Sequence, residues 1–454
     1  MKLLKVHVHN YRHLKDVSLT FEPDLYPQVF AIGSENGGGK STLLQLIFTF
    51  LHCTPHPELH KFAINAIQHM NGSFEEWDEK IHQIIDIDLL DKDNNKISIS
   101  YFLYPINSSA PEKLGNSWDI AIHFMFEFQV LKDTLTSLYS KKKTLLSSLN
   151  NLNSMELNAD IKIRKKKFQD SLRVIEKQID NSQETLHAMA INTYSQKLQE
   201  ENLESLFFLK LPNYHGNVSN YSLCCKVETD NYINANHILI NLANHIFLAG
   251  QTTQPYIFLS NENIRDMFNS DKSYELTLEK ARLEIGNLYN FNAFAINEIV
   301  AAFKTALEED AKSMIQNGYY GCSFSDLTKE LKFLLGGNKE ILPTPECDGL
   351  TIRYYLDDKN YKELSLGALS HGELKRVCLY SWIRHNKASQ SIVLIDEIEN
   401  GLHPDWQYQI VKDLQEWGDN QYILATHSFY LCEALTPRHV KELAPKMSQP
   451  ILNK

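Results

Sequence analysis

Long apolar segments are missing from this chain of 454 residues. A membrane-spanning helix needs about 18 to 20 consecutive apolar residues, and no stretch of the sequence provides them. The first seven residues alternate between apolar and polar side chains and lack the continuous apolar core of a secretory signal. These absences predict a cytoplasmic protein that does not bind membranes.

Cysteine is scarce, and its spacing excludes two further classes of protein. The seven cysteines are an odd number, and none has the CxxC spacing of a zinc ribbon or a redox motif. The composition is otherwise ordinary for a globular protein, with 43% hydrophobic and 22% charged residues. A net charge of −11 argues against a chain that covers nucleic acid with its whole surface, but a local basic patch is compatible with it.

The clearest motif is a glycine-rich loop between a strand and a helix. Residues 29–32 are predicted to form a buried strand, 33–42 the loop, and 43–51 an apolar helix. This order is typical of a phosphate-binding loop, because glycine lets backbone N–H groups close around an anion at a helix N-terminus. It predicts bound ATP and Mg²⁺, with Lys40 between the β- and γ-phosphates and Ser41 as a metal ligand. The expected binding residues are Asn36, Gly37, Gly38, Gly39, Lys40, Ser41 and Thr42.

One position departs from the usual pattern of this loop. The first glycine of GxxxxGK[ST] falls at position 34, where this chain has Ser34, with Gly33 immediately before it. The start of the loop must therefore accommodate a Cβ atom. A glycine-rich turn without a ligand is the alternative interpretation.

Two acidic residues follow a second apolar strand. Residues 391–395 are predicted to form this strand, and Asp396 and Glu397 come next. In a parallel sheet such a strand carries its aspartate to the carboxyl edge, beside the phosphates. We expect Asp396 to hold Mg²⁺ through water and Glu397 to orient or deprotonate the attacking water. A strand that ends in a solvated acidic turn is the alternative.

Two further segments complete a set of four. The sequence LSHGE at 369–373 precedes a predicted helix, so Ser370 and the backbone of Gly372 lie at a helix N-terminus, where an anion is favoured. His427 follows a predicted strand over 422–425. A serine helix cap and an ordinary loop histidine are the plainer explanations. In this order, however, the four segments resemble the P-loop, signature, Walker B acids and switch histidine of ABC ATPases.

The resemblance implies a mechanism that needs two copies of the chain. In ABC ATPases the signature contacts the γ-phosphate of the nucleotide on the opposite subunit, so Ser370 and Gly372 imply an ATP-sandwich dimer. Glu397, His427 and Lys40 are the implied catalytic residues. The implied fold is an α/β ATPase head with a mixed P-loop sheet flanked by helices, an antiparallel β subdomain and a helical lobe.

The distance between the motifs points to one branch of the superfamily. Lys40 and Ser370 are 330 residues apart, whereas transporter ATPases place these motifs much closer together. The turn at Tyr11 and Arg12 and the run DEIENGLHP at 396–404 resemble SMC, RecF and OLD-type ATPases, most closely the ATPase subunit of Septu anti-phage defence systems (PtuA). The resemblance implies that Arg12 flanks the adenine.

The Septu resemblance also implies partners. A separate HNH nuclease subunit is expected, and the dimer is expected to assemble into a higher oligomer. OLD-type proteins carry a nuclease domain after the histidine, whereas this chain ends 26 residues after Ser428, so we expect no nuclease activity of its own. The main alternative is a RecF- or SMC-like ATPase that repairs or clamps DNA without a nuclease. A transporter ATPase is the least favoured interpretation.

The segment between the motifs is predicted to contain an antiparallel coiled-coil hairpin. Apolar residues recur at heptad spacing over 131–152 and over 161–189, on either side of a polar joint. A register in which facing residue numbers sum to about 306 pairs Leu135 with Leu172, and Leu138 with Phe168. The same register places Lys142 opposite Lys165, where two like charges oppose pairing.

Basic residues gather on this predicted hairpin. They include Lys142, Arg164, Lys165 and Lys166. We expect them to bind the phosphates of DNA or RNA, or an acidic partner surface. The alternative is a solvated helix face whose lysines extend out of the seam.

A chain of this length suits two to four lobes. We expect an N-terminal ATPase lobe (1–127), the hairpin (128–206), the remainder of the first lobe with a strand at 255–259 (207–260), a helical lobe (261–340) and a C-terminal ATPase lobe (341–454). The Q-loop glutamine of the family is either Gln254 or Gln129. A zinc site at His52, Cys53, His56 and His60 is an alternative to a plain turn, which Pro55 and Pro57 favour.

Overall fold

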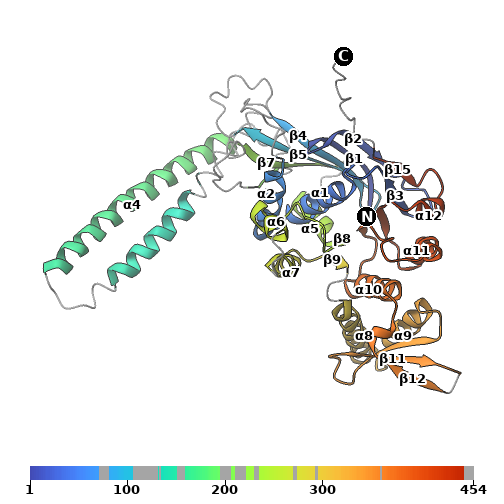
Figure 1. The fold of residues 1–454 in the computed structure, drawn as a ribbon. Helices are drawn as coiled ribbons and strands as arrows, with labels where there is room; N and C mark the ends of the chain where they lie inside the picture. The colour runs from blue at the N-terminus through green and yellow to red at the C-terminus, as the bar shows by residue number, and fades with distance from the viewer. Residues whose placement is uncertain are drawn as a thin grey trace, which may run out of the picture. The chain divides into compact units, whose positions relative to one another are not determined.

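The computed structural model describes residues 1–70, 81–105, 131, 134–150, 159–194, 206–209, 221–229, 235–268, 273–291, 295–357 and 360–443. These divide into two compact units, Met1–Tyr104 with Leu209–Lys454, and Pro105–Phe208 (Figure 1). The first unit holds the four motifs, and the second holds the predicted hairpin. Among the described helices, none combines the length and hydropathy needed to cross a bilayer.

A parallel sheet forms the core of the first unit. Its strand order is β15-β3-β14-β13-β8-β9, and neighbouring strands run parallel. The central strands are buried along almost their whole length, as apolar runs covered on both faces require. The α/β class and the predicted motif strands are confirmed. The bounds are β3 (Val29–Gly33), β8 (Ile246–Gln251), β9 (Leu288–Phe291), β13 (Ile392–Asp396), β14 (Gln421–Ala425) and β15 (Val440–Glu442).

Helices cover this sheet. Helix α1 begins directly after the glycine-rich loop and packs against β8, β13 and β14, and α2 and α5 pack against α1. The apolar helix predicted after the loop is therefore confirmed. The bounds are α1 (Lys40–Cys53), η1 (Pro57–Leu59), α2 (His60–Gln68), α5 (Ala235–Asn244), α6 (Asn261–Phe268), α7 (Ser273–Ile285), α11 (Pro404–Glu416) and α12 (Phe429–Glu433).

An antiparallel sheet forms the predicted β subdomain. Its strands β1 (Lys2–Tyr11), β2 (Leu14–Thr20), β4 (His82–Leu90), β5 (Lys96–Pro105) and β7 (Tyr221–Thr229) follow the order β2-β1-β4-β5-β7. Along β1, Val6 and Val8 are buried, whereas the alternating residues His7 and His9 are only half-buried. The β1–β2 turn at Arg12 and His13 packs against the phosphate loop at Gly39.

A helical lobe surrounds the signature. Helices α8 (Ala295–Asn317), α9 (Ser323–Leu334) and α10 (His371–His385) pack together, beside β10 (Lys339–Pro343), β11 (Leu350–Tyr355), β12 (Tyr361–Leu364) and η5 (Leu366–Ala368) (Figure 1). Two expectations need correction. The range 261–340 contains β9, an edge strand of the parallel sheet, and the apolar run 255–259 forms turns instead of a strand. In that run, the Ile257 N–H bonds the side chain of Gln45 on α1 instead of a neighbouring strand.

The second unit contains two packed helices, residues 134–150 and α4 (Ala159–Tyr194), together with most of β6 (Leu206–Leu209). Leu135 and Leu138 cluster with Ile179, and Ile175 packs against them. The hairpin is antiparallel, because the Gln183 amide reaches Tyr139 whereas Glu176, nearer the start of α4, reaches residue 142. Coiled-coil supertwist stays a prediction.

The predicted register of the hairpin is wrong. Lys142 does not face Lys165, because its Nζ lies 2.9 Å from Oε1 of Glu176. Likewise, Leu135 and Leu138 do not pair with Leu172 and Phe168. The observed register replaces a like-charge contact with an ion pair, which favours it electrostatically.

Candidate ATP-binding site

The carboxyl edge of the parallel sheet gathers the predicted site residues. The loop of residues 34–39 follows β3, Asp396 ends β13, and His427 lies just after β14, which is hydrogen-bonded to both other strands. Because these strands are parallel, their carboxyl ends meet at one edge, which is where ligands bind in such sheets. The order of the strands in the sheet thus brings motifs that are far apart in the sequence close together.

The phosphate loop leads into α1 through a left-handed glycine. Gly39 has a φ of 93° and directly precedes Lys40, the first residue of the helix. A Cβ on Gly39 would come within 2.6 Å of the His13 ring, so a side chain at this position would collide with the β1–β2 turn. This turn, in which Arg12 has a φ of 56°, therefore lies against the loop. Burial and the neighbouring Arg12 lower the pKa of His13.

The structure explains how the loop accommodates Ser34. The Lys40 Nζ donates to the backbone oxygen of Ser34 at 3.2 Å and to its Oγ at 3.0 Å. A Cβ on Gly38 would lie only 2.3 Å from that Oγ. The side chain at position 34 thus occupies space that the absent side chain of Gly38 leaves open, and it holds the ammonium group of Lys40.

Asp396 is buried without a well-formed hydrogen bond. The residue is 2% exposed, and neither carboxylate oxygen has a hydrogen bond of normal geometry with the described residues. Burial raises the pKa of Asp396 to about 6, although the nearby Ser41 and Gln254 side chains oppose the increase. Burial also lowers the pKa of Lys40, against the opposing charges of Asp396 and Glu399. An unsatisfied buried carboxylate beside a hydroxyl group fits a divalent cation.

Glu397 has an unusual backbone conformation. Its φ is 52°, a left-handed conformation that is uncommon for a residue with a Cβ and often occurs at functional sites. The Glu397 N–H donates to the Ala425 oxygen at 2.9 Å, and the Asn400 side-chain amide donates to Oε2 of Glu397 at 2.6 Å. The half-buried carboxylate is therefore held next to the end of β14, two residues before His427.

Glu399 links the acidic run to the histidine. It is 9% exposed, its Oε1 accepts a hydrogen bond from the His427 N–H at 2.7 Å, and its Oε2 has no partner among the described residues. The His427 side chain itself is exposed. The role of Glu399 as an anchor was not predicted, although its position within the DEIENGLHP run was a signal for it.

The signature segment caps α10. Ser370 Oγ accepts from the Glu373 N–H at 3.3 Å, and Glu373 Oε2 accepts from the Ser370 N–H at 2.8 Å, which forms a capping box. Gly372 faces Trp406, and a Cβ there would lie 2.7 Å from its ring. Ser370 is exposed, and no hydrogen bond among the described residues joins it to the loop of residues 33–42. Within one chain, the signature serine acts as a helix cap.

A family model described as an AAA ATPase domain matches residues 1–432. The chain belongs to this family. The α/β architecture described above, with a parallel sheet, an antiparallel sheet and a helical lobe, agrees with the fold that the sequence predicts. Most of the chain, including all four motifs, therefore lies within one AAA ATPase domain.

Curated relatives match a shorter part of the chain. The retron Vc95 probable ATPase of Vibrio cholerae serotype O1 biovar El Tor is 35% identical over 114 residues, 22% of this chain and 21% of the relative. The retron Ec83 probable ATPase of Escherichia coli is 34% identical over 95 residues, 18% of each protein. The chain spans about a fifth of the length of these relatives.

Solved structures with low overall similarity include an Smc head domain and RecF. The Smc head domain of Pyrococcus furiosus, bound to the C-terminal domain of ScpA, has 12% identity and a TM-score of 0.31, covering 95% of this chain and 91% of that one. The recombination mediator RecF with ATPγS has 14% identity and a TM-score of 0.27, covering 94% and 93%.

A buried lysine of this ATPase domain was missed by sequence reasoning. Lys375, on α10, is 6% exposed, and its Nζ donates to the backbone oxygens of Glu397 at 3.1 Å and Asn400 at 3.0 Å. The Nζ also lies 4.1 Å from the ring centre of Phe291. Burial lowers the pKa of Lys375 to about 8. Its hydrogen-bond acceptors are backbone carbonyl groups, so no pattern of residue types could predict the contact.

Of the two candidates for the Q-loop glutamine, the structure describes Gln254. The Gln254 side chain lies close enough to Asp396 to lower the pKa of that carboxyl group, and its Nε2 is buried without a hydrogen bond of normal geometry among the described residues. Gln251, the last residue of β8, donates to the Glu397 backbone oxygen at 3.4 Å. Gln129 lies outside the described residues.

The cluster at 52–60 forms a turn instead of a zinc site. The two ring nitrogens of His52 lie 2.8 Å and 2.6 Å from the backbone oxygens of Ala243 and Ile285. His60 Nε2 lies 2.9 Å from the Thr54 oxygen. These contacts occupy the nitrogens that a metal would need, and they favour the plain-turn interpretation.

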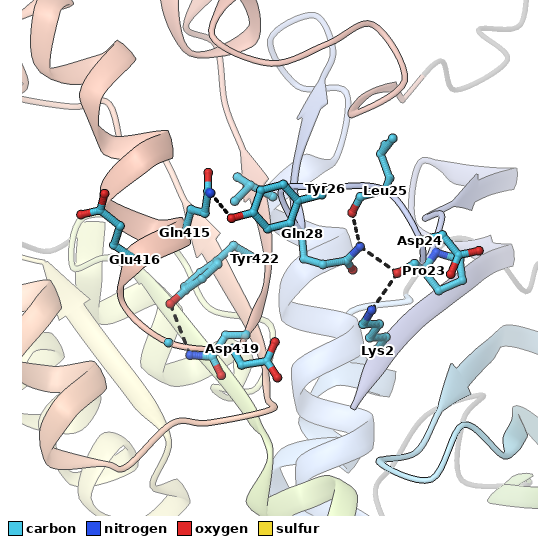
Figure 2. Close-up of a pocket in the computed structure, with 13 residues that line it drawn as sticks. Lys2, Pro23, Asp24, Leu25, Tyr26, Gln28, Gln415, Glu416, Asp419 and Tyr422 are labelled. Atoms are coloured by element: carbon cyan, nitrogen blue, oxygen red, sulfur yellow. Dashed lines mark hydrogen bonds between the residues drawn. The ribbon is translucent and has the colours of Figure 1, made fainter.

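A separate hollow lies at the opposite edge of the parallel sheet, with a volume of about 580 Å³. Val29 and Tyr422, near the amino ends of β3 and β14, are among its lining residues. Figure 2 shows Tyr26 hydrogen-bonded to Gln415 across this hollow. The motif residues of the ATPase domain lie at the other edge, so this hollow is not the nucleotide site.

Proposed function

We propose that the protein binds ATP with Mg²⁺ at the carboxyl edge of its parallel sheet and hydrolyses it when two copies close on the nucleotide. The observation that carries this proposal is Asp396, which is buried beside Ser41 and Lys40 without a hydrogen bond of normal geometry. A buried carboxylate without a partner is costly, and a cation at this position would remove that cost. Family membership supports ATP as the nucleotide.

Each residue of the site has a distinct proposed role. Ser41 and, through water, Asp396 would hold Mg²⁺, which neutralises charge on the triphosphate. Lys40 contacts the β- and γ-phosphates, as its buried ammonium group at the start of α1 allows. Glu397 orients or deprotonates the attacking water. His427 contacts the γ-phosphate from the end of β14.

Two contacts extend the proposed site. Backbone N–H groups of residues 36–42 surround the phosphates, and the Arg12 turn, which packs on Gly39, flanks the adenine. Ser370 and Gly372 of a second copy complete the pocket at the γ-phosphate. The exposure of the Ser370 end of α10 supports this, because a partner's nucleotide can reach it.

The cellular role that we propose is anti-phage defence. In a Septu-like complex, ATP-dependent closure of the subunits would regulate a separate HNH nuclease, within an assembly larger than a dimer. The likeness to two retron ATPases supports this role. Purification of the chain together with the products of its neighbouring genes tests the assignment; a complex that contains no HNH protein would remove the nuclease partner.

ATP hydrolysis by three variants tests the catalytic assignment. Lys40→Ala should abolish ATP binding, because it removes the charge that holds the triphosphate. Glu397→Gln should retain binding and lose at least about 100-fold in kcat, the lower range for a general base. The matched control Glu416→Gln makes the same change at an exposed position and should hydrolyse ATP normally. Wild-type kcat in Glu397→Gln contradicts the assignment.

A DNA-clamping ATPase is the second candidate function, favoured by the basic face of the hairpin. Lys165, Lys166 and Arg173 line a shallow hollow of about 400 Å³ on α4, and Arg164 is exposed beside them. Lys142, by contrast, is engaged by Glu176. Arg164, Lys166 and Arg173, which are exposed, and the half-buried Lys165 could contact nucleic-acid phosphates.

Binding of a labelled DNA duplex and of an RNA at several salt concentrations tests this candidate. The double variant Lys165→Glu/Lys166→Glu should weaken binding and reduce the slope of log affinity against log salt by about 2, because two phosphate contacts are lost. Lys177→Glu, an exposed change on the same helix, is the control. An unchanged slope in the double variant discards the interface.

A further inference from the structure

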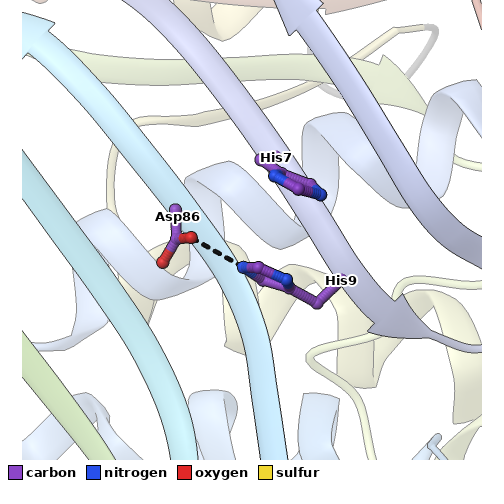
Figure 3. Close-up of side chains that lie close together, drawn as sticks. All are labelled: His7, His9 and Asp86. Carbon is purple, nitrogen blue, oxygen red and sulfur yellow. Dashed lines mark hydrogen bonds and ion pairs between the residues drawn. The ribbon is translucent and has the colours of Figure 1, made fainter.

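A cluster of metal-binding side chains lies on the antiparallel sheet, outside the proposed ATP site. His7 and His9 on β1 and Asp86 on β4 each offer one ligand atom, and these atoms all lie within 4.8 Å of one another. The three side chains converge on one face of the sheet (Figure 3). We infer that they form a binding site for one Zn²⁺ ion or a chemically similar transition-metal ion.

The strand register builds this cluster. His7 and His9 are separated by one residue, so both side chains leave the same face of β1, opposite the buried face of Val6 and Val8. In the pairing of β1 with β4, Asp86 is directly opposite His7. The two imidazole rings stack with centres 4.3 Å apart, and His9 Nε2 lies 2.6 Å from Asp86 Oδ2. Little movement is needed to place all three around one ion.

A fourth residue, Asp16 on β2, orients the cluster. Its Oδ1 lies 3.2 Å from His7 Nε2. This contact leaves Nδ1 of His7 as the ring nitrogen available to an ion. A carboxylate that holds one nitrogen of an imidazole while the other binds metal is the usual arrangement around ligating histidines. Asp16 is therefore inferred to position His7 instead of binding the ion itself.

The chemistry of these groups selects the metal. Two imidazoles and one carboxylate suit Zn²⁺ and similar ions, whereas Mg²⁺ prefers oxygen ligands alone. Three protein ligands leave a fourth position open. A small hollow of about 230 Å³, lined by Asp88 and Ser98 besides His7 and Asp86, adjoins the cluster and could admit water there. Lys5 also lines this hollow and opposes a cation, and Lys96 neutralises Asp88 at 3.3 Å, so the negative charge that favours the ion comes from Asp86 and from Asp16 beside His7.

The site has a structural consequence. An ion bound by His7, His9 and Asp86 would link β1 to β4 near the end of β1. The turn that packs on Gly39 begins only three residues after His9. The inference stands on the sheet geometry and does not depend on ATP hydrolysis.

The test uses the full chain after removal of metal with a chelator. We expect the wild type to bind one Zn²⁺ per chain in competition with a chromophoric chelator, and Co²⁺ in its place to give visible absorption bands. His9→Gln and Asp86→Asn each remove a ligand and should lower Zn²⁺ affinity at least about tenfold. Excess Mg²⁺ should not displace the Zn²⁺.

Two controls separate this site from unspecific binding and from misfolding. His237→Gln changes an exposed histidine on α5 and should leave the affinity unchanged. Asp16→Asn leaves all three ligands in place and should give a smaller loss than His9→Gln. Zn²⁺ should also raise the melting temperature of the wild type but not of a His7→Gln/His9→Gln variant. Equal Zn²⁺ affinity in the wild type and the ligand variants, or no binding by the wild type, overturns the inference.

Discussion

Asp396 shows at the scale of one residue how burial prepares a side chain for a cation. In water its carboxylate would be solvated, but at the end of β13 it is 2% exposed and lacks a hydrogen bond of normal geometry from the described residues. Its pKa rises to about 6 because burial disfavours the charged form. The buried carboxylate therefore lowers the stability of the ligand-free protein and raises its affinity for a cation.

The free energy of unfolding of the metal-free, nucleotide-free protein should depend on the ionisation of Asp396. The pKa of Asp396 is about 6 in the folded protein and 3.8 for an unperturbed aspartate, so the folded state binds this proton more tightly. Stability is then lost as the pH rises from 3.8 towards 6, by about 3 kcal/mol in all. Asp396→Asn should restore about 3 kcal/mol at about pH 7.5 and about half of that at about pH 5.

Urea denaturation at the two pH values measures this effect. The control Asp24→Asn makes the same change at an exposed position and should be nearly neutral at both. A stabilisation by Asp396→Asn that does not grow with pH would show that the buried charge is not its cause.

Some residue contacts could not be predicted from sequence. The loop motif predicted where Lys40 and Ser41 lie, because glycine spacing and helix start are local properties. The compensation between Ser34 and Gly38 depends on a contact across the loop, and Lys375 binds backbone oxygens that carry no residue identity. Such contacts appear only when the chain is folded.

At the scale of elements, strand order determines which motifs lie next to each other, which spacing in the sequence does not show. The motif strands were predicted from apolar runs ending in functional residues, and β3, β13 and β14 confirm them. The hairpin register was wrong because heptad spacing fixes which face of a helix packs but not its sliding along the partner. The ion pair of Lys142 with Glu176 marks the observed register.

Helix α10 connects the signature to the acidic loop through Lys375. Lys375→Met removes the hydrogen bonds to the Glu397 and Asn400 backbone but keeps most of the apolar volume. We expect kcat for ATP hydrolysis to fall about 10- to 100-fold through misplacement of Glu397, with KM little changed. Steady-state kinetics measures both constants. The matched control Lys412→Met changes an exposed lysine on α11. A rise in KM with an unchanged kcat would contradict this positioning role.

At the scale of the whole molecule, the proposed account needs a second copy of the chain. Each chain holds a complete phosphate loop and acidic pair, whereas Ser370 caps α10 and makes no hydrogen bond to that loop among the described residues. Closure that depends on a γ-phosphate would distinguish ATP from ADP, which is the requirement for a switch. The sequence predicted the need for a second copy only through family resemblance, because the residues of one chain do not show how a second copy approaches it.

The molecular mass of Glu397→Gln in solution, measured by sedimentation with and without ATP and Mg²⁺, tests the shared site most directly. The account predicts that ATP raises the mass at least twofold, that ADP does not, and that adding Ser370→Arg prevents the increase while Ser370→Thr, which keeps the helix cap, permits it. A mass that does not respond to ATP, or that rises equally with Ser370→Arg, would contradict the claim that a second copy completes the site.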